Sequence, residues 1–181
     1  GTSGDAVLVM PSASGSLFSE FFLAQYRKRG VGNDSMSYPT DGLTIWHVDA
    51  TLNSAGNNFL YNNQYTNHKL LKLMQADGLE QVEAAASSQA DAGDFYVSPK
   101  SLTPATVPNS SRYNGTNSDV YITNISAGGG SNMTATFSIG SATTYPLAVS
   151  KSGNGTINSS PGGISCGTVC SASFNSGANV S

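Results

Sequence analysis

Short strand-like runs separated by turn residues are the feature that most limits what this chain can fold into. Apolar or alternating stretches recur along the sequence, and glycine, proline, asparagine or aspartate residues interrupt them. Such runs are typical of β-strands, because successive side chains of a strand point to opposite faces of a sheet. We therefore predict strands at residues 6–10, 19–26, 43–48, 68–75, 119–125 and 133–139.

One region favours a helix instead. Residues 79–86 (LEQVEAAA) are rich in helix formers, and Glu80 and Glu83 would lie in the first turn, where acidic side chains are stabilising. The predicted fold class is all-β, mostly an antiparallel β-sandwich-like arrangement, with this one short helix.

A change in composition at residues 140–144 (GSATT) indicates a boundary. We predict a β-rich domain at residues 1–139, a linker at 140–144 and a small β-repeat module at 145–181. Turn signals at residues 153–155 and 160–163 divide the last segment into strands at 145–150, 156–158 and 172–174. A unit of about 40 residues is near the lower limit for independent folding, so a cross-link would help it.

The only two cysteines are Cys166 and Cys170. No histidine lies near them, and a structural zinc site needs about four ligands, so we predict a local disulfide rather than a metal site. Two free thiols are the alternative. A disulfide implies an oxidising compartment, and we therefore expect a secreted or cell-surface protein, of bacterial type from its polar, weakly charged composition.

Composition also excludes some partners. Only 10% of the residues are charged and the net charge is -3, so no basic face is expected to neutralise the phosphates of a nucleic acid. No apolar run approaches the roughly 20 residues needed to cross a bilayer, so no membrane span is predicted.

A catalytic zinc site is not predicted within this chain. The histidines are His47 and His68, no HExxH motif occurs, and a catalytic zinc needs about three protein ligands. His47 and Asp49 share a strand face, and an aspartate that orients a histidine is part of many active sites. We predict a hydrogen-bonded structural pair instead. No GxSxG nucleophile motif is present either, so no catalytic residue is assigned.

Asp77, Asp91 and Asp94 are candidate calcium ligands. They lie beside glycines that permit tight turns, and calcium takes about six to eight oxygen ligands from carboxylates and carbonyls. The spacing does not match an EF-hand loop. Aspartate and glycine are also ordinary turn residues, so a turn without an ion is the alternative.

Four tyrosines lie in or near loops rich in asparagine: Tyr61, Tyr65, Tyr96 and Tyr113. Exposed aromatic rings beside amides can bind sugars. Tyrosines that cap a β-sandwich core give the same sequence pattern, and a place in the core is the prediction here.

Five segments in order carry a resemblance to a known family. They are residues 20–27 (EFFLAQYR), 42–49 (GLTIWHVD), 75–78 (QADG), 90–94 (ADAGD) and 113–126 (YNGTNSDVYITNIS). Residues from about 6 to 139 resemble the region downstream of the catalytic motif in M6 metallopeptidases, the immune inhibitor A-like enzymes. Gln25 and Tyr26 depart from the family pattern, which usually has Glu and Asn there.

This resemblance implies a non-catalytic, C-terminal part of a secreted zinc metallopeptidase. Zinc and its HExxH helix are then expected only in a catalytic domain of the parent protein, which would be the partner of this chain. Without that motif, this chain is expected to have no peptidase activity of its own. The matching motif residues with an expected structural role are Glu20, Arg27, Trp46, His47 and Asp49.

The last segment, residues 145–181, resembles a bacterial repeat of the InlB B-repeat type, cut off before its last strands. The resemblance implies an extracellular spacer or adhesion module. It is carried by Leu147, Val149, Lys151, Gly153, Gly155, Ile157, Ser159, Pro161, Gly163, Ile164, Cys166, Gly167, Cys170 and Phe174.

Two other functions remain as alternatives. The chain would act as an extracellular surface binding or self-assembling β-module if its peptidase half were missing or degenerate, because unpaired strand edges template pairing. A free-standing enzyme would have to use His47 and Asp49.

Overall fold

The computed structural model describes residues 6–11, 16–31, 38–64, 67–83, 90–140, 144–175 and 178–181. Their secondary structure consists of antiparallel strands and two short 3-10 turns, which confirms the predicted all-β fold. The chain divides into two compact units, residues 1–140 and 141–181.

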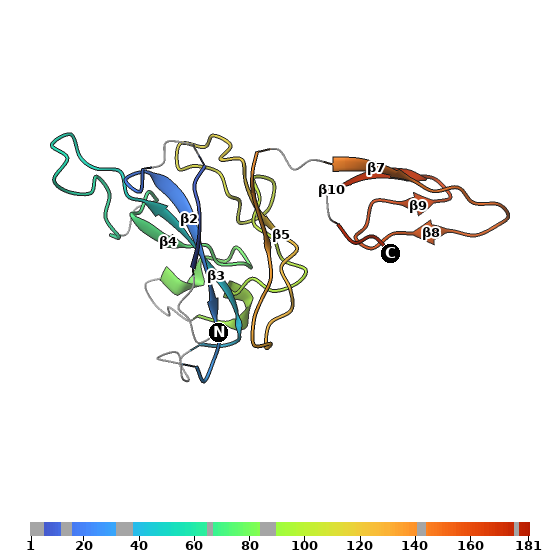
Figure 1. Cartoon of the computed structure of the whole chain (residues 1–181), viewed down its shortest axis with the longest axis horizontal. Coiled ribbons are helices and arrows are strands. Elements are labelled where there is room, and N and C mark those ends of the chain that lie inside the picture. The colour runs from blue at the N-terminus through green and yellow to red at the C-terminus, as the bar shows by residue number, and fades with distance from the viewer. Residues whose placement is uncertain are drawn as a thin grey trace. The chain divides into compact units, whose positions relative to one another are not determined.

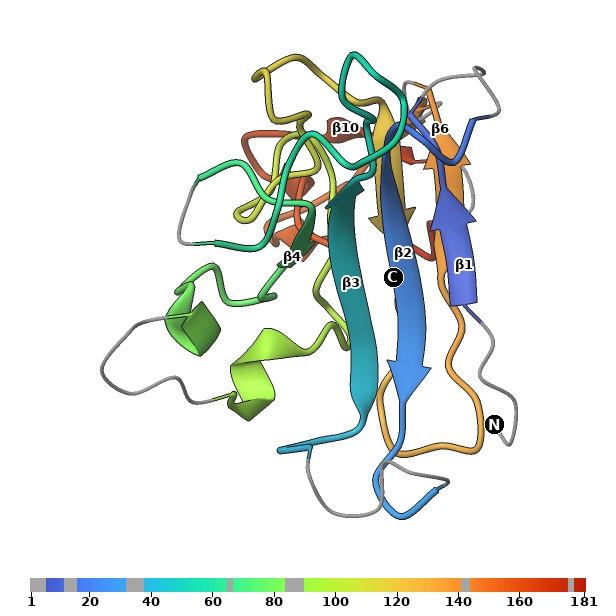
Figure 2. The same ribbon diagram turned by 90° about the vertical axis from the view of Figure 1, so that its left-hand side faces the viewer.

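A four-stranded antiparallel sheet is the centre of the first unit (Figure 2). Its strands are β1 (Ala6–Val9), β2 (Glu20–Arg27), β3 (Gly42–Asp49) and β4 (Leu71–Leu73), in the order β1-β2-β3-β4. The longest pairing joins β2 to β3, from Glu20 opposite Asp49 to Arg27 opposite Gly42. This register fixes which side chains share each face of the sheet.

A second layer covers one face of this sheet (Figure 1). It contains the antiparallel pair β5 (Val120–Thr123) and β6 (Thr136–Ile139), and Leu102 forms an isolated bridge to Ile122. The core lies between the layers, in the sandwich-like arrangement that the alternating strands predict. Its buried residues are Val9, Phe22, Ala24, Leu43, Ile45, Met74, Ala76, Tyr96, Leu102, Val120, Ile122 and Ile125.

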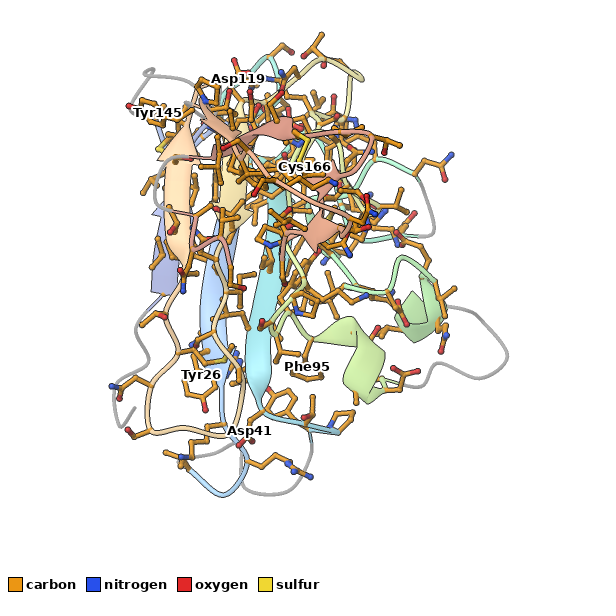
Figure 3. The ribbon with its side chains drawn as sticks, turned by 90° about the vertical axis from the view of Figure 1, so that its right-hand side faces the viewer. Tyr26, Asp41, Phe95, Asp119, Tyr145 and Cys166 are labelled. Atoms are coloured by element: carbon orange, nitrogen blue, oxygen red, sulfur yellow. A yellow bond between two sulfur atoms is a disulfide. The ribbon has the colours of Figure 1, made fainter. Side chains whose placement is uncertain are left out.

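A glycine-rich turn closes one end of this sandwich. The Tyr26 hydroxyl and the Lys28 ammonium both donate to the Gly130 carbonyl, each at 2.8 Å. Tyr26 and Asp41 lie at this same end of the sheet (Figure 3). A Cβ at residue 128 would lie 2.4 Å from the Asp41 carbonyl oxygen, so the close approach of the two backbones requires Gly128.

The α-helix predicted at residues 79–86 does not form in the described residues 79–83. The structure has a single 3-10 turn, η1 (Gln81–Glu83), and residues 84–86 lie outside the described residues. Glu80 has a φ of 55°, in the left-handed region, which an α-helix cannot include. The Gln75 side-chain oxygen accepts from the Gln81 and Val82 N–H groups and satisfies the donors of this turn instead.

The predicted strand at 68–75 is also shorter than expected. Only β4 (Leu71–Leu73) forms, and His68 lies in the segment before it. The Leu71 N–H donates to the Asn63 side chain, and the Leu70 N–H donates to the Asn62 carbonyl. Because these donors bind the preceding asparagine-rich loop, the regular ladder starts late.

The second unit contains two small antiparallel sheets. One pairs β7 (Thr144–Ala148) with β10 (Ser171–Asn175), and the other pairs β8 (Ile157–Asn158) with β9 (Ser165–Cys166). The disulfide between Cys166 and Cys170 is confirmed. Cys166 and Ile164 are the buried apolar residues of this unit in the described part of the chain.

Candidate functional site

Five aromatic rings stack one on another at the end of the main sheet. Their order is Phe22, His47, Tyr113, His68 and Tyr61, with successive centroid distances of 4.4, 4.3, 4.1 and 3.4 Å. We call this set the ring column. Two strands and two loops, distant in sequence, each contribute to it.

The strand register places the first two rings of the column. Phe22 on β2 is opposite His47 on β3, so both side chains point to the same face. His47 is 3% exposed. Its Nε2 lies 2.7 Å from Oε1 of Glu20, and the same carboxylate oxygen accepts the Tyr113 N–H at 2.7 Å. Glu20 therefore fixes both the imidazole and the loop that stacks on it.

Asp49 holds the other histidine of the column. Its Oδ2 lies 2.7 Å from His68 Nε2, and its Oδ1 accepts from the Thr51 N–H and hydroxyl. Burial alone would raise the pKa of the Asp49 carboxyl. The hydrogen bonds from Thr51 and His68 outweigh that effect, and the pKa lies below its ordinary value.

The predicted direct pair of His47 and Asp49 is therefore wrong. Both residues do share a face, but residues two apart in a strand are separated by about 7 Å, beyond hydrogen-bonding distance. Each side chain instead meets a group from a neighbouring segment: His47 meets Glu20, diagonal to it across the β2–β3 ladder, and Asp49 meets His68.

The geometry of the histidines also bears on zinc. Each Nε2 faces a different carboxylate, and each ring is stacked on both sides by other rings. In the part of the chain that the structure describes, neither histidine belongs to a group of three or more side chains able to share a metal ion. The ring column is a packed assembly rather than an open metal site.

The four tyrosines have different surroundings. Tyr96 is fully buried in the core, as predicted, and its hydroxyl has no hydrogen-bond partner among the described residues. Burial raises its pKa, and the charges of Glu80 and Asp77 raise it further. Tyr61 and Tyr113 belong to the ring column: Tyr113 stacks between the two histidines, and Tyr61 stacks on His68 with one face. Tyr65 lies outside the described residues.

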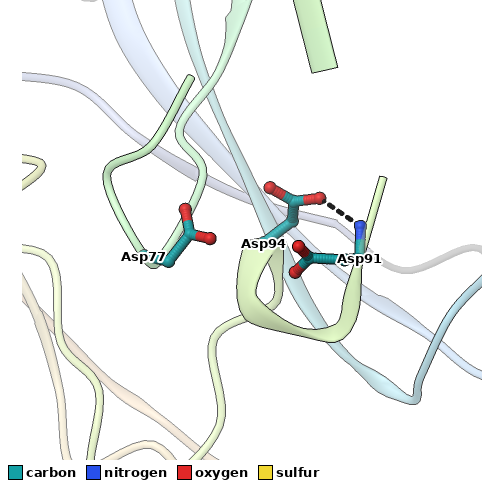
Figure 4. Close-up of side chains that lie close together, drawn as sticks. All are labelled: Asp77, Asp91 and Asp94. Carbon is teal, nitrogen blue, oxygen red and sulfur yellow. Dashed lines mark hydrogen bonds between the residues drawn. The ribbon is translucent and has the colours of Figure 1, made fainter. Parts of the chain in front are cut away.

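The structure brings the three candidate calcium ligands together (Figure 4). Asp77 lies in the turn after β4, Asp91 is the N-cap of the 3-10 turn η2 (Ala92–Asp94), and Asp94 is its last residue. One carboxylate oxygen from each lies within 4.8 Å of the others. We call this set the aspartate cluster. The Ala76 N–H donates to the Asp94 carbonyl at 3.1 Å and joins the two turns.

Local hydrogen bonds orient each carboxylate of the aspartate cluster. Asp94 Oδ2 accepts from the Asp91 N–H at 2.7 Å, and Asp91 Oδ1 accepts from the Gly93 N–H at 2.6 Å. Asp77 Oδ1 accepts from the Leu79 N–H at 2.9 Å. The side chains of Asp91 and Asp94 form a capping box, in which they accept from the N–H groups at the start of η2.

Charge accumulates in the aspartate cluster. Burial raises the pKa of Asp94, and the charges of Asp77 and Asp91 raise it further, against the Asp91 N–H bond, which lowers it. No lysine or arginine of the described residues forms an ion pair with these carboxylates. A Cβ at residue 93 would lie 2.8 Å from both Asp77 Oδ2 and Asp91 Oδ1, so glycine leaves the space between them free. The donor set and this space fit a hard cation.

A pocket of about 320 Å³ lies beside the ring column. His47 and Tyr113 form part of its wall, together with Lys72, Glu80 and Arg112. Lys72 Nζ and Glu80 Oε1 form an ion pair at 2.9 Å. The pocket and the ring column could not be predicted from the sequence, because their residues come from segments that only the folded chain brings together. One signal was available for Glu20: pairing residues 19–26 with 43–48 places it on the face of His47.

Two further motif residues have roles in packing. The Arg27 guanidinium lies 5.6 Å from the centroid of the Tyr38 ring, over its face. Trp46 lies on the opposite face of the sheet from the ring column, between Leu23 and Leu73.

Comparison of the chain with protein-family models, with curated proteins and with solved structures gives no match. In the described residues, no helix has the length and apolar character that a membrane span requires.

Proposed function

We propose that this chain is a non-catalytic, β-rich accessory region of a secreted M6-like zinc metallopeptidase, with a structural role toward the catalytic domain of its parent protein. The ring column is the observation that carries the proposal. The motif residues Glu20, His47 and Asp49 are engaged in hydrogen bonds that join strands to loops. Groups held in this way stabilise a fold and are poorly placed to ligate a catalytic metal.

The disulfide supports the extracellular part of the proposal. Cys166 and Cys170 are both oxidised in a small unit with few buried apolar residues. Disulfides of this kind persist in oxidising compartments. A secreted or cell-surface location follows, and zinc is expected in the catalytic domain rather than in this chain.

Peptidase activity and the neighbouring gene sequence test this function together. The purified chain is expected to leave casein intact, with or without a chelator. The reading frame upstream of the Gly1 codon is expected to encode an HExxH motif within a few hundred codons. Chelator-sensitive cleavage of casein by the chain would overturn the non-catalytic role, and an upstream frame without the motif would overturn the peptidase relationship.

Calcium binding by the aspartate cluster is a second part of the proposal. Three carboxylates lie close together with no cationic partner among the described residues, and a bound Ca²⁺ would remove their repulsion. The ion would also hold the turn after β4 against η2, next to the buried Tyr96. Its role is therefore structural.

Millimolar calcium is expected to raise the melting temperature of the chain. A ligand at about 100 times its dissociation constant stabilises by about 2.7 kcal/mol, which is about 5–10 °C for a domain of this size. Asp91→Asn is expected to abolish most of the shift because it removes one charge and one ligand. Differential scanning calorimetry and titration calorimetry measure the shift and the heat.

Asp119→Asn is the matched control for this experiment. It makes the same chemical change outside the aspartate cluster, and asparagine tolerates the φ of 57° at that position. Its calcium response is expected to equal that of the unmodified chain. Absence of both binding heat and a melting shift at millimolar calcium would rule out the ion.

The second candidate function is an extracellular surface binding or self-assembling β-module. Exposed apolar side chains of the second unit favour it: Tyr145 is 60% exposed and Val169 49%. The sheet of β7 and β10 has only two strands, so in the described residues each of the two has an edge that pairs with no other strand.

A further inference from the structure

The tripeptide Asn-Gly-Thr occurs twice in the chain, at residues 114–116 and at residues 154–156. No other asparagine of the sequence is followed by glycine. In an Asn-Gly pair the backbone nitrogen of the glycine can attack the asparagine side chain, because glycine has no Cβ to obstruct the approach. Since the same three residues stand at both places, we expect the fold to decide how reactive each asparagine is.

Hydrogen bonds hold the first copy of the tripeptide. Asn114 Oδ1 accepts from the Thr116 N–H at 3.0 Å and from the Thr116 hydroxyl at 2.7 Å. The Gly115 N–H donates to the Arg112 carbonyl at 2.9 Å, and the Arg112 N–H donates to the Thr116 carbonyl at 2.9 Å. Both reacting groups are therefore restrained, the side-chain amide by Thr116 and the backbone nitrogen by Arg112.

The loop that contains the first copy is also fixed to the main sheet. The Tyr113 ring stacks between His47 and His68, and the Tyr113 N–H donates to Glu20 at 2.7 Å. A segment anchored in this way opens less often than an exposed loop with few contacts. The hydrogen bonds of Asn114 and Gly115 are therefore expected to persist in the folded protein.

The second copy lacks these restraints. Asn154 and Gly155 are exposed, in a segment between β7 and β8 that extends away from the small sheets of its unit (Figure 1). Among the residues that the structure describes, neither the Asn154 side chain nor the Gly155 N–H has a hydrogen-bond partner. A Cβ at residue 155 would meet nothing within 4 Å, so the space around the attacking nitrogen is open.

We propose that Asn154 is a site of spontaneous deamidation in the folded protein, whereas Asn114 is protected. The Gly155 backbone nitrogen loses its proton to base and attacks Cγ of Asn154. The bond between Cγ and the side-chain nitrogen breaks, ammonia leaves, and a cyclic succinimide remains. Water then opens the ring at one of its two carbonyl carbons, which gives aspartate or isoaspartate. One water is consumed for each ammonia released, and the reaction needs no oxidant or cofactor.

The reaction changes the second unit in two ways. It adds one negative charge to a chain whose net charge is -3, in the bend where Lys151 Nζ donates to the Gly153 carbonyl at 3.1 Å. The isoaspartate product also lengthens the backbone by one carbon just before β8. That strand pairs with β9 through only two residues, so we expect the isoaspartate form to weaken the pairing.

Peptide mapping of the full chain after incubation in mildly alkaline buffer tests the proposal. Trypsin cleaves after Arg112 and Lys151, so the two asparagines fall into separate peptides, 113–151 and 152–181. Tandem mass spectrometry locates the gain of about one mass unit at the modified residue. Asn154 is expected to react about tenfold faster than Asn114 or more, because the hydrogen bonds at Asn114 and Gly115 must first break.

Concentrated urea provides the control for the effect of the fold. In the unfolded chain the two rates are expected to become similar, because the tripeptides are the same. Gly155→Ala is the matched variant: its methyl group enters open space and obstructs the attacking nitrogen. It is expected to slow the reaction at Asn154 several-fold and to leave the circular dichroism spectrum unchanged.

Two results would overturn the proposal. Equal rates at Asn114 and Asn154 in the folded chain would show that the fold does not distinguish them. An Asn154 that stays intact while a synthetic peptide of residues 152–158 deamidates would show that the folded segment protects this residue too. Neither result bears on the peptidase relationship or on calcium.

Discussion

Phe22→Ala is expected to lower the free energy of unfolding by about 3–5 kcal/mol, because the phenyl ring is fully buried between the two layers. The loss combines the transfer of the ring out of water with the cavity that remains. Phe22 also forms one end of the ring column, so His47 would lose one of its two stacking contacts. Urea denaturation followed by Trp46 fluorescence measures the change.

Phe18→Ala is the control for this substitution. It removes the same ring from a residue that is 58% exposed and lies just before β2. The expected loss is about 0.5 kcal/mol or less, as for most surface substitutions. Equal losses for the two variants would mean that Phe22 is not part of a closed core.

Glu20→Ala is expected to cost about 2–4 kcal/mol, because one carboxylate oxygen serves both His47 Nε2 and the Tyr113 N–H. Removing it leaves a buried imidazole and a loop amide without their acceptor. Glu20→Gln keeps an acceptor oxygen in the same place and is expected to recover at least half of the loss. Thermal and urea unfolding of the three proteins measure the differences.

Glu80→Ala is the matched control for Glu20→Ala. Glu80 is likewise a bonded carboxylate, paired with the Lys72 ammonium, but its side chain is 45% exposed. A solvent-exposed ion pair contributes about 0–1 kcal/mol, so the variant is expected to remain close to the unmodified chain. A large loss for Glu80→Ala and a small one for Glu20→Ala would contradict the structural role assigned to the ring column.

Strand positions and sheet class follow from local sequence in this chain. Apolar and polar side chains alternate in residues 119–125 and 133–139, and residues 43–48 form an apolar run. These local patterns predict strands, and β5, β6 and β3 are found where expected. The helix at 79–86 fails because composition cannot show that Glu80 adopts a left-handed backbone conformation or that Gln75 caps the turn. Tertiary contacts override helix propensity there.

Only part of the candidate site could be predicted from the sequence. The aspartate cluster could be expected, because Asp91 and Asp94 are close in sequence and Asp77 lies in a similar turn. The hydrogen-bond partners of the two histidines could not be predicted. The Glu20–His47 contact depends on the diagonal pairing of residues across β2 and β3, and the His68 contact depends on the conformation of a long loop. Tyr113 joins Glu20 across a separation of 93 residues, for which no local pattern exists.

The long sequence separation between the two layers of the sandwich limits the order in which they can form. Pairing of β1, β2 and β3 closes loops of 10 and 14 residues, whereas the core face of that sheet has no cover until β5, about 70 residues further along, has docked. Closing such long loops is slow in proteins dominated by distant contacts. A sheet that formed before β5 docked would expose its apolar core face, and such exposed surface favours aggregation. Synthesis of the chain therefore leaves the core face of β1–β3 uncovered until residue 123 has been added.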